Sequence, residues 1–175
     1  MGVHKFKTDL SVKGIEQLKK ELLNYKNAEL RQKVNTLVRL LAEQGVLIAQ
    51  ANITSYDAIF TGELLSSISA KNGGGTNGTA IFYIVADSRH AVFVEFGTGQ
   101  IGSEAPYPYP LPPGVDWEYN SGKTIFEISP GQYGWFYPKG DKWYFTQGMP
   151  SRPFMYETAM ELQELILKTA REVFK

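Results

Sequence analysis

Residues 27–52 read NAELRQKVNTLVRLLAEQGVLIAQAN and place apolar side chains at every third or fourth position. This spacing gathers them on one face of a helix and leaves the polar side chains on another. The stripe consists of Leu30, Val34, Leu37, Leu41 and Ile48. Gly45 continues the stripe, which predicts a close contact with a neighbouring element rather than a helix break. The stretch therefore predicts a long helix that packs along one side.

Residues 151–175 predict a second helix at the other end of the sequence. Ser151 is a candidate N-cap, and Pro153 is tolerated in a first turn. The predicted buried stripe is Met155, Ala159, Leu162, Ile166 and Val173. Acidic residues come early and basic residues late, an order that complements the helix dipole.

The segments between and around these helices predict strands. Residues 61–72 are interpreted as a turn entering a strand, and 79–86 as its partner, with a flexible connection at 71–78. Residues 3–10 suit an edge strand, a short helix begins near Gly14, and the apolar stretch 91–96 is taken as the last strand region. The fold class expected is α+β, an antiparallel sheet packed by a long N-terminal helix and a C-terminal helix.

The composition of the chain excludes several kinds of functional site. The chain has 175 residues, 18 basic and 18 acidic, and no cysteine. The last fact excludes disulfides, a thiol nucleophile and a thiolate zinc site. Charge is uneven along the chain: residues 1–50 carry nine basic and five acidic residues, whereas 51–150 carry five basic and nine acidic. No apolar run is long enough for a membrane span or a signal peptide, so we expect synthesis in a cytoplasm.

A Pro- and aromatic-rich stretch interrupts this pattern. All nine prolines lie at or after Pro106, and twelve of the 23 aromatic residues lie between Tyr107 and Phe145. Residues 105–113 should be extended. A strand is expected at 123–129, and a second hairpin where 135–137 and 142–145 flank a Pro-Lys-Gly-Asp turn. Residues 101–149 are therefore predicted to be an inserted β-hairpin lobe of a core formed by 1–100 plus 150–175.

The sequence contains few residues that could form a catalytic, metal or nucleotide-binding site. Gly97–Gly102 matches G-x-G-x-x-G, but the prolines that follow should prevent the helix that nucleotide binding needs. His4 and His90 lack the companions of a metal site, and a catalytic pair of His90 with Glu95 is one of many chance combinations. Glu95 lies in an apolar stretch, so it needs a partner. We expect it to accept N–H groups from the Gly-Thr-Gly turn or to pair with Arg152. No catalytic residue, cofactor or metal is predicted.

The aromatic residues of the lobe have two interpretations, an exposed binding surface for protein or sugar, or the core of a small satellite unit. The candidate binding residues are Tyr107, Tyr109, Trp117, Tyr119, Trp135, Tyr137, Trp143 and Tyr144.

Three motifs occur together in a known order: TGELLSSI at 61–68, AVFVEFGTG at 91–99 and PSRPFM at 150–155. With the opening segment GIEQL at 14–18, they resemble the tail-component, or tail-completion, proteins of long-tailed double-stranded-DNA phages and prophages. The resemblance covers about residues 3–100 and 150–174. Two departures are His90, where the family commonly has a tyrosine, and the inserted lobe itself.

The resemblance implies a non-enzymatic virion protein at the head–tail junction or tail end. It would oligomerise into a ring, either by itself or only on assembly with the connector, and dock to connector and tail-tube proteins after being made in the host cytoplasm. Under this interpretation the following residues are structural: Thr61, Gly62, Leu64, Ile68, Glu95, Gly97, Thr98, Gly99, Arg152, Pro153 and Phe154. The alternatives kept open are a binding module with a glycan or protein ligand in the 101–149 lobe, an enzyme based on His90 and Glu95, and contact between the basic helix and packaged DNA.

Overall fold

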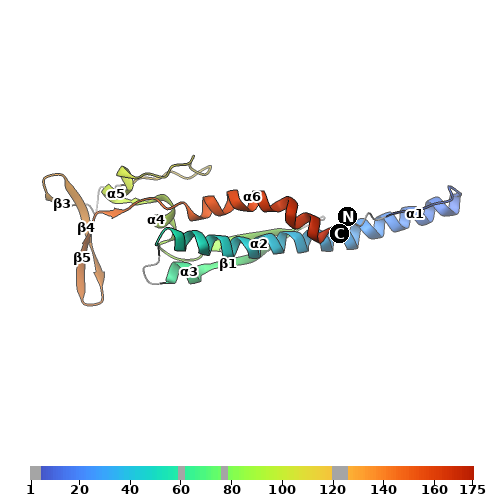
Figure 1. Ribbon diagram of the computed structural model, residues 1–175, viewed down its shortest axis with the longest axis horizontal. Coiled ribbons are helices and arrows are strands. Elements are labelled where there is room, and N and C mark those ends of the chain that lie inside the picture. The colour runs from blue at the N-terminus through green and yellow to red at the C-terminus, as the bar shows by residue number, and fades with distance from the viewer. Residues whose placement is uncertain (1–4, 59–61, 76–78, 120–125) are drawn as a thin grey trace. The chain divides into compact units, whose positions relative to one another are not determined.

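The computed structural model describes residues 5–58, 62–75, 79–119 and 126–175, and it is an α+β protein as predicted (Figure 1). The helices are α1 (Val12–Asn24), a π-helical turn η1 (Tyr25–Glu29), α2 (Leu30–Ser55), α3 (Glu63–Ser67), α4 (Ala91–Phe96), α5 (Gly99–Glu104) and α6 (Phe154–Val173). The strands are β1 (Ile68–Gly74), β2 (Ile81–Ala86), β3 (Phe126–Ser129), β4 (Gln132–Lys139), β5 (Lys142–Thr146) and β6 (Gly148–Met149).

The chain forms two compact units, which are described separately. Unit 1 comprises Met1–Ile48, Ile68–Val85 and Thr158–Lys175, and unit 2 comprises Ala49–Ser67 and Ala86–Glu157. The aromatic stretch 101–149 thus groups with residues on both sides of it in unit 2. The proposed boundary between a core of 1–100 plus 150–175 and a separate lobe stays a prediction.

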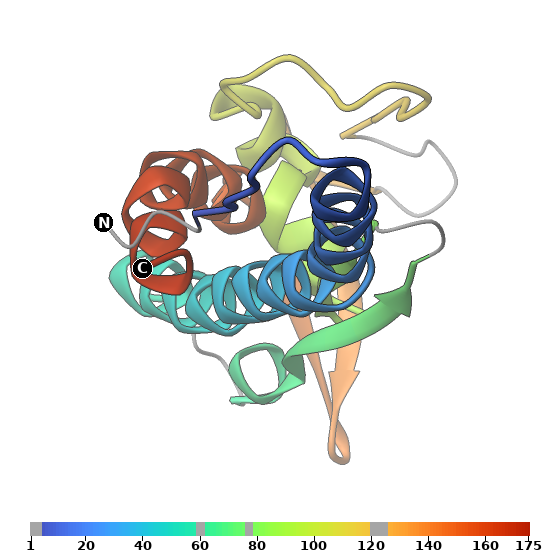
Figure 2. The ribbon, with the colours of Figure 1, turned by 90° about the vertical axis from the view of Figure 1, so that its right-hand side faces the viewer.

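Unit 1 is built on α2, which lies between α6 and the β1–β2 hairpin (Figures 1 and 2). Gly45 makes this packing close, as predicted. A Cβ built there would lie 2.2 Å from Ile84 Cδ1 of β2 and 2.8 Å from Leu162 Cδ1 of α6. Thr169 Oγ1 of α6 also lies 3.4 Å from Gln44 Oε1 of α2. A glycine in the interior of a helix is unfavourable by itself, and here the approach of two neighbours explains it.

The buried faces of both long helices are shifted from the predicted stripes. In α6 the best-buried positions include Phe154, Thr158 and Thr169, whereas the predicted Ala159 and Ile166 are exposed. In α2 the small Ala42, Gly45 and Ala49 are buried together with Ile53, and the large side chains of the predicted stripe are only half-buried. Small side chains at the centre of the contact allow the close approach of the backbones, while the large ones flank it.

The N-terminal segment differs from its prediction. Residues 5–9 belong to no strand, and residues 3 and 4 of the expected edge strand lie outside the described residues. Ser11 caps α1 by accepting a hydrogen bond from Gly14 N at 3.0 Å. Phe6 then contacts Tyr25 edge-to-face, with ring centroids 5.7 Å apart, so the segment runs back along α1 instead of pairing with a sheet.

Three short helices replace predicted irregular or extended segments in unit 2. Residues 63–67 form α3 before β1 begins, and the apolar stretch 91–96 forms α4 rather than a strand. The expectation that prolines would prevent a helix after Gly97 is also wrong, because α5 spans Gly99–Glu104 and ends just before Pro106. Helix α4 has only six residues, but four of them are buried. The secondary structure of this segment is therefore set by its packing and not by its propensity for a strand. Residues 106–113 are neither helix nor strand.

The predicted second hairpin is present, within a three-stranded sheet of order β3-β4-β5. Its turns use glycines with positive φ, Gly131 after Pro130 and Gly140 before Asp141. Pro138 lies in the part of β4 that pairs with β5 but extends past the residues paired with β3, so its missing N–H interrupts no described ladder on that edge. Residues 123–125 of the strand expected at 123–129 lie outside the described residues.

Candidate functional site

Glu95 joins α4 to the first turn of α6. Its Oε2 accepts a hydrogen bond from Met155 N at 2.8 Å, and its Oε1 accepts one from Tyr156 N at 3.1 Å. The side chain is buried, with 7% of its surface exposed. Burial raises the pKa of Glu95, and the two N–H groups oppose this shift by favouring the charged carboxylate. A carboxylate at this point satisfies N–H groups that have no partner within the helix.

This contact corrects two expectations. Glu95 accepts backbone N–H groups, but from α6 and not from the Gly-Thr-Gly turn, and the described residues hold no ion pair between Glu95 and Arg152. Ser151 is not the N-cap, because α6 begins at Phe154. Ser151 Oγ instead donates to Glu95 O at 2.7 Å, and Arg152 N donates to Val94 O at 2.8 Å. The end of α4 and the start of α6 are thus held by both backbone and side chain.

The Gly97-Thr98-Gly99 turn packs directly on the chain that leads into α6. Thr98 and Gly99 form isolated antiparallel bridges with Met149 and Gly148. A Cβ on Gly97 would lie 2.7 Å from Ser151 N, and one on Gly148 would lie 1.8 Å from Thr98 O. Both glycines have positive φ, 79° and 96°. The contact therefore needs glycine on both sides. The resemblance named Gly97 as a structural residue, and no sequence pattern singled out Gly148.

The N-terminus of α5 offers no phosphate site. Gly99 N donates to Tyr119 O at 2.8 Å, and Ile101 N donates to Gln147 O at 3.1 Å. The glycine motif at 97–102 is therefore a packing element. Gln100, which no sequence pattern singled out, links α5 to its surroundings, since its Oε1 accepts from Tyr133 N and Gln147 Nε2 at 3.0 and 2.9 Å.

An aromatic cluster surrounds Phe96 in unit 2. The Phe96 ring lies 4.8 Å from Tyr107 and 5.2 Å from Trp117, measured between centroids. Tyr109 stacks on Tyr156 at 3.9 Å. The polar atoms are also used, since Trp117 Nε1 donates to Gly97 O at 2.9 Å. Aromatic contacts of this kind contribute beyond the area that they bury.

A tyrosine–carboxylate group lies beside this cluster. Tyr56 Oη donates to Glu157 Oε1 at 2.5 Å, and Tyr109 Oη approaches the same oxygen at 3.4 Å. Burial first, and then the Glu157 carboxylate, raises the pKa of Tyr56 above its ordinary value. Burial raises the pKa of Tyr107 to about 12. At neutral pH Tyr56 and Tyr109 therefore keep their protons and both direct them at Glu157, so these three side chains form a structural contact.

Some of the eight candidate binding residues belong to a packed core, and others are exposed as a binding surface would require. Tyr107 is buried in unit 2, and Tyr109, Trp117 and Tyr119 are half-buried there, with Tyr119 Oη accepting a hydrogen bond from Tyr107 N at 2.9 Å. Trp135 faces Gly99 of α5, and both it and Tyr137 are half-buried. Trp143 and Tyr144 are exposed, with 68% and 42% of their surfaces accessible.

The structural motif residues take the following positions. Leu64, Ile68, Pro153 and Phe154 are buried, and Phe154 is wholly inaccessible. Gly62 has a φ of 74° with open space around it, as a turn residue would. Arg152 is half-buried, and Thr61 and His4 lie outside the described residues. His90 is exposed and its side chain does not cap α4.

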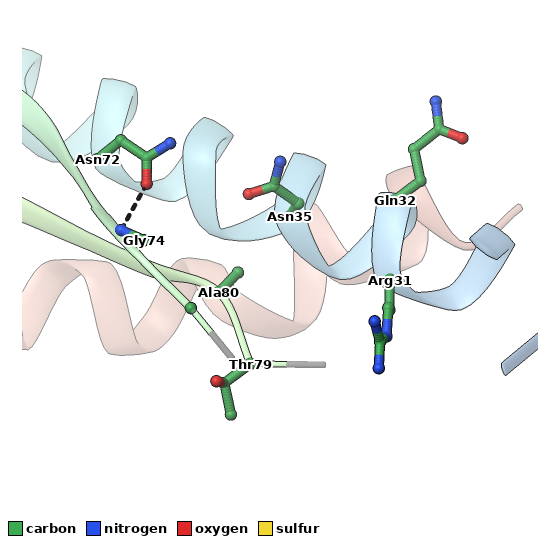
Figure 3. Close-up of a pocket in the computed structure, with 8 residues that line it drawn as sticks. Arg31, Gln32, Asn35, Asn72, Gly74, Thr79 and Ala80 are labelled. Atoms are coloured by element: carbon green, nitrogen blue, oxygen red, sulfur yellow. Dashed lines mark hydrogen bonds between the residues drawn. The ribbon is translucent and has the colours of Figure 1, made fainter. Parts of the chain in front are cut away.

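Two open pockets lie among the described residues, and neither gathers catalytic groups. One, of about 400 Å³, lies between the start of α2 and the tip of the β1–β2 hairpin. Figure 3 shows that its polar side chains point in different directions, with Asn72 turned onto Gly74 N of its own strand. The other, of about 350 Å³, lies over Glu95, Phe96 and Tyr107 in unit 2 and is almost entirely apolar. The described part of the chain contains no cluster of three or more metal-ligating side chains.

No protein-family model matches the chain, and neither curated proteins nor solved structures include a significant match. Across the described residues, no helix is both long enough and apolar enough to cross a membrane.

Proposed function

We propose that the chain is a structural protein of a long-tailed double-stranded-DNA phage or prophage, and that it works at the head–tail junction or tail end. It acts by forming a ring and docking to connector and tail-tube proteins, without catalytic turnover, cofactor or metal. Packaged DNA passing through the ring would be its only nucleic-acid contact. Its place is the virion, and before assembly the host cytoplasm.

The observation that supports this proposal is the contact between the second and third motif segments in unit 2. The second and third are tied by Glu95 to α6, and by Arg152 N to Val94 O at 2.8 Å. The first is tied to the residues just before α4, since Asp87 N donates to Ser67 O at 3.3 Å and Ser88 Oγ lies 3.3 Å from Glu63 Oε1. Motifs distant in sequence that build one substructure are more specific than any of them alone.

The same arrangement supports a role without chemistry. Glu95 is the carboxylate most suited to catalysis by burial, and both of its oxygens are already occupied by backbone N–H groups. A protein that acts through its surfaces needs such internal ties, and it also needs exposed apolar side chains, which α1 and the β4–β5 hairpin supply.

The test is removal of the gene from the phage or inducible prophage that carries it, followed by electron microscopy of the particles. We expect DNA-filled heads and tails that fail to join, and rescue by the wild-type gene supplied in trans. Intact, infectious particles in the deletion strain would refute the proposal. The adjacent reading frames provide a second check, with a connector gene upstream and a tail-tube gene downstream expected.

The aromatic hairpin favours one other candidate, a binding module for a glycan or protein ligand. Trp143 exposes 68% of its surface, an arrangement that suits stacking on a sugar ring. Titration with soluble sugars, followed by tryptophan fluorescence, distinguishes this candidate. A saturable change that is lost in Trp143→Ala would support it, and no change with any sugar would count against it.

A further inference from the structure

An open pocket of about 350 Å³ lies in unit 2, where the first turn of α6 meets α4. Its size falls in the range of small-molecule sites, roughly 300–1,000 Å³. Further lining residues come from the end of β2 and from residues 106–113, so four separate segments line one space. Ala86 and Ala91 contribute only methyl groups to the wall, which leaves the space open. The pocket therefore has the size and the composite wall of a binding site.

Three aromatic rings line this pocket and meet at steep angles. The Tyr107 ring lies 4.8 Å from Phe96 and 6.2 Å from Tyr156 between centroids, with the planes 62° and 88° apart. Two rings outside the wall hold them in place, since Trp117 packs on Phe96 at 5.2 Å and Tyr109 stacks on Tyr156 at 3.9 Å. The orientation of the three lining rings is thus fixed before any ligand arrives. Rings placed at such angles around a space form an aromatic cage, the usual site for an alkylated ammonium group.

The charge of the pocket wall is negative. Among the described residues that line it, Glu95 is the only charged one. The N–H groups of α6 that Glu95 accepts offset only part of its charge, because a helix N-terminus carries roughly half a positive charge. Burial and the like charge of Glu157 both raise the pKa of Glu95, and the described residues contain no ion pair between Glu95 and a basic side chain. A cation is therefore the ligand that complements this pocket.

We propose that this pocket binds a small organic cation with an alkylated ammonium group, held by the rings of Phe96, Tyr107 and Tyr156 beside the Glu95 carboxylate. The alkyl groups suit the apolar wall, and their carbon-bound charge is attracted by both the ring faces and the carboxylate. A metal ion needs several oxygen ligands, which this wall does not offer. The ligand would contact α4, α6 and residues 106–113 together. The inference goes beyond the proposed function and does not rest on it.

The experiment titrates the full-length protein with tetramethylammonium chloride and records amide NMR spectra, with the ionic strength held constant by sodium chloride. We expect saturable shifts that are confined to α4, residues 106–113 and the first turn of α6. The matched ligand control is tert-butanol, a neutral molecule of similar size and shape. Because it lacks the charge, it should bind at least about tenfold more weakly than tetramethylammonium.

Two variants test the two parts of the site. Glu95→Gln removes the charge and Tyr156→Leu removes one ring, and each should weaken tetramethylammonium binding at least about fivefold. Glu118→Gln and Tyr133→Leu make the same kinds of change at exposed positions of unit 2 outside the pocket, and both should bind like the wild type. Circular dichroism checks that each variant is folded. If Glu95→Gln proves too unstable, Tyr156→Leu and the neutral ligand still decide the question.

The titration of Glu95 gives a readout that a purely structural change would not move. A cation bound beside the carboxylate favours its charged form, so saturating tetramethylammonium should lower the pKa of Glu95. Carboxyl NMR measures this pKa directly. Sodium chloride at the same ionic strength should leave it unchanged, and so should tert-butanol.

Several results would overturn the inference. The first is the absence of saturable shifts around the pocket with tetramethylammonium. The second is equally tight binding of tert-butanol, which would make the pocket a site for neutral apolar molecules. The third is binding of a lysine-containing peptide without binding of tetramethylammonium, which would assign the pocket to a protein partner. None of these results bears on particle assembly in the gene deletion, so the proposed function and this site can fail separately.

Discussion

At the scale of single residues, Glu95 shows how a buried charge can be structural. The carboxylate lies among apolar side chains, but its two oxygens accept N–H groups in the first turn of α6. Unpaired burial would be costly for both groups, and pairing them removes both costs. The need for a partner followed from the sequence. The identity of the partner did not, because Met155 and Tyr156 are 60 and 61 residues away.

Replacing Glu95 by Gln should lower the free energy of unfolding at pH 7 by about 1–2 kcal/mol. The amide NH₂ would then face one of the two N–H groups that the carboxylate now accepts. Urea denaturation measures the change, and Glu164→Gln, at an exposed position on α6, is the matched control with an expected change near zero. Equal stability of Glu95→Gln and wild type would remove the capping role.

The hydrogen bond of Tyr56 predicts that the free energy of unfolding depends on pH. Its hydroxyl donates to Glu157, so Tyr56→Phe should cost about 1 kcal/mol at neutral pH. Because burial and Glu157 raise the folded-state pKa of Tyr56 above 10.0, the folded protein holds this proton more tightly than the unfolded chain does. The free energy of unfolding of the wild type therefore falls as pH rises from about 10 through the folded pKa.

Tyr56→Phe lacks that proton, so the difference in stability between wild type and variant should shrink above about pH 10. Denaturation at pH 8 and pH 11 measures it. The control is Tyr83→Phe at an exposed position of β2, for which the difference should stay small at both pH values. A gap that widens with pH would contradict the proposed hydrogen-bonded pair.

At the scale of elements, the contact between the Gly-Thr-Gly turn and β6 orients the start of α6. A side chain larger than hydrogen would fit much less well at a glycine of this contact than at a glycine of a hairpin turn. Gly148 and Gly131 both have positive φ, but a Cβ on Gly148 would lie 1.8 Å from Thr98 O, whereas nothing lies within 4 Å of one on Gly131. At both positions any other residue would adopt an unfavourable backbone conformation, but only at Gly148 would its side chain also collide with a neighbour.

Gly148→Ala should therefore destabilise the protein by about 3 kcal/mol or more, and Gly131→Ala by only about 1 kcal/mol. Thermal or urea denaturation of the two variants gives the comparison directly. A similar decrease in stability for both variants would mean that the segments joined at Thr98 and Gly148 separate easily. The bridge between them would then not be what orients α6.

Element prediction succeeded where the signal was local. The spacing of apolar residues identified α2 and α6, and the Pro-Lys-Gly-Asp turn at 138–141 identified the β4–β5 hairpin. It failed for 91–96, because an apolar run with β-branched and aromatic residues suits a strand as well as a buried helix. Packing on Tyr107, Trp117 and Phe154 makes it a helix, and that environment is built by residues more than ten positions away.

At the scale of the whole molecule, the zero net charge hides two units of opposite charge. Unit 1 carries 13 basic and 8 acidic residues, a net charge of +5, and unit 2 carries 5 basic and 10 acidic residues, a net charge of −5. In the proposed ring, segregation of this size would steer association between copies, and dissolved salt would screen it.

Raising the salt concentration should consequently weaken self-association. Between about 50 and 500 mM NaCl we expect the dissociation constant to rise several-fold, mainly through slower association. Asp116→Lys with Glu118→Lys, both at exposed positions in unit 2, should weaken association at low salt and flatten the salt dependence. A dissociation constant that is independent of salt would mean that the opposite charges of the two units do not drive association.

Local information was sufficient for the α+β class, the two long helices and the hairpins, since periodicity and turn residues act over a few positions. It was also sufficient for the expectation that Glu95 needs a partner and that Gly45 marks a close contact. Three-dimensional packing was needed to decide which aromatic rings are buried and which are exposed, and to bring Glu95 to α6. These outcomes depend on contacts between segments far apart in the chain, and no local pattern encodes which segments meet.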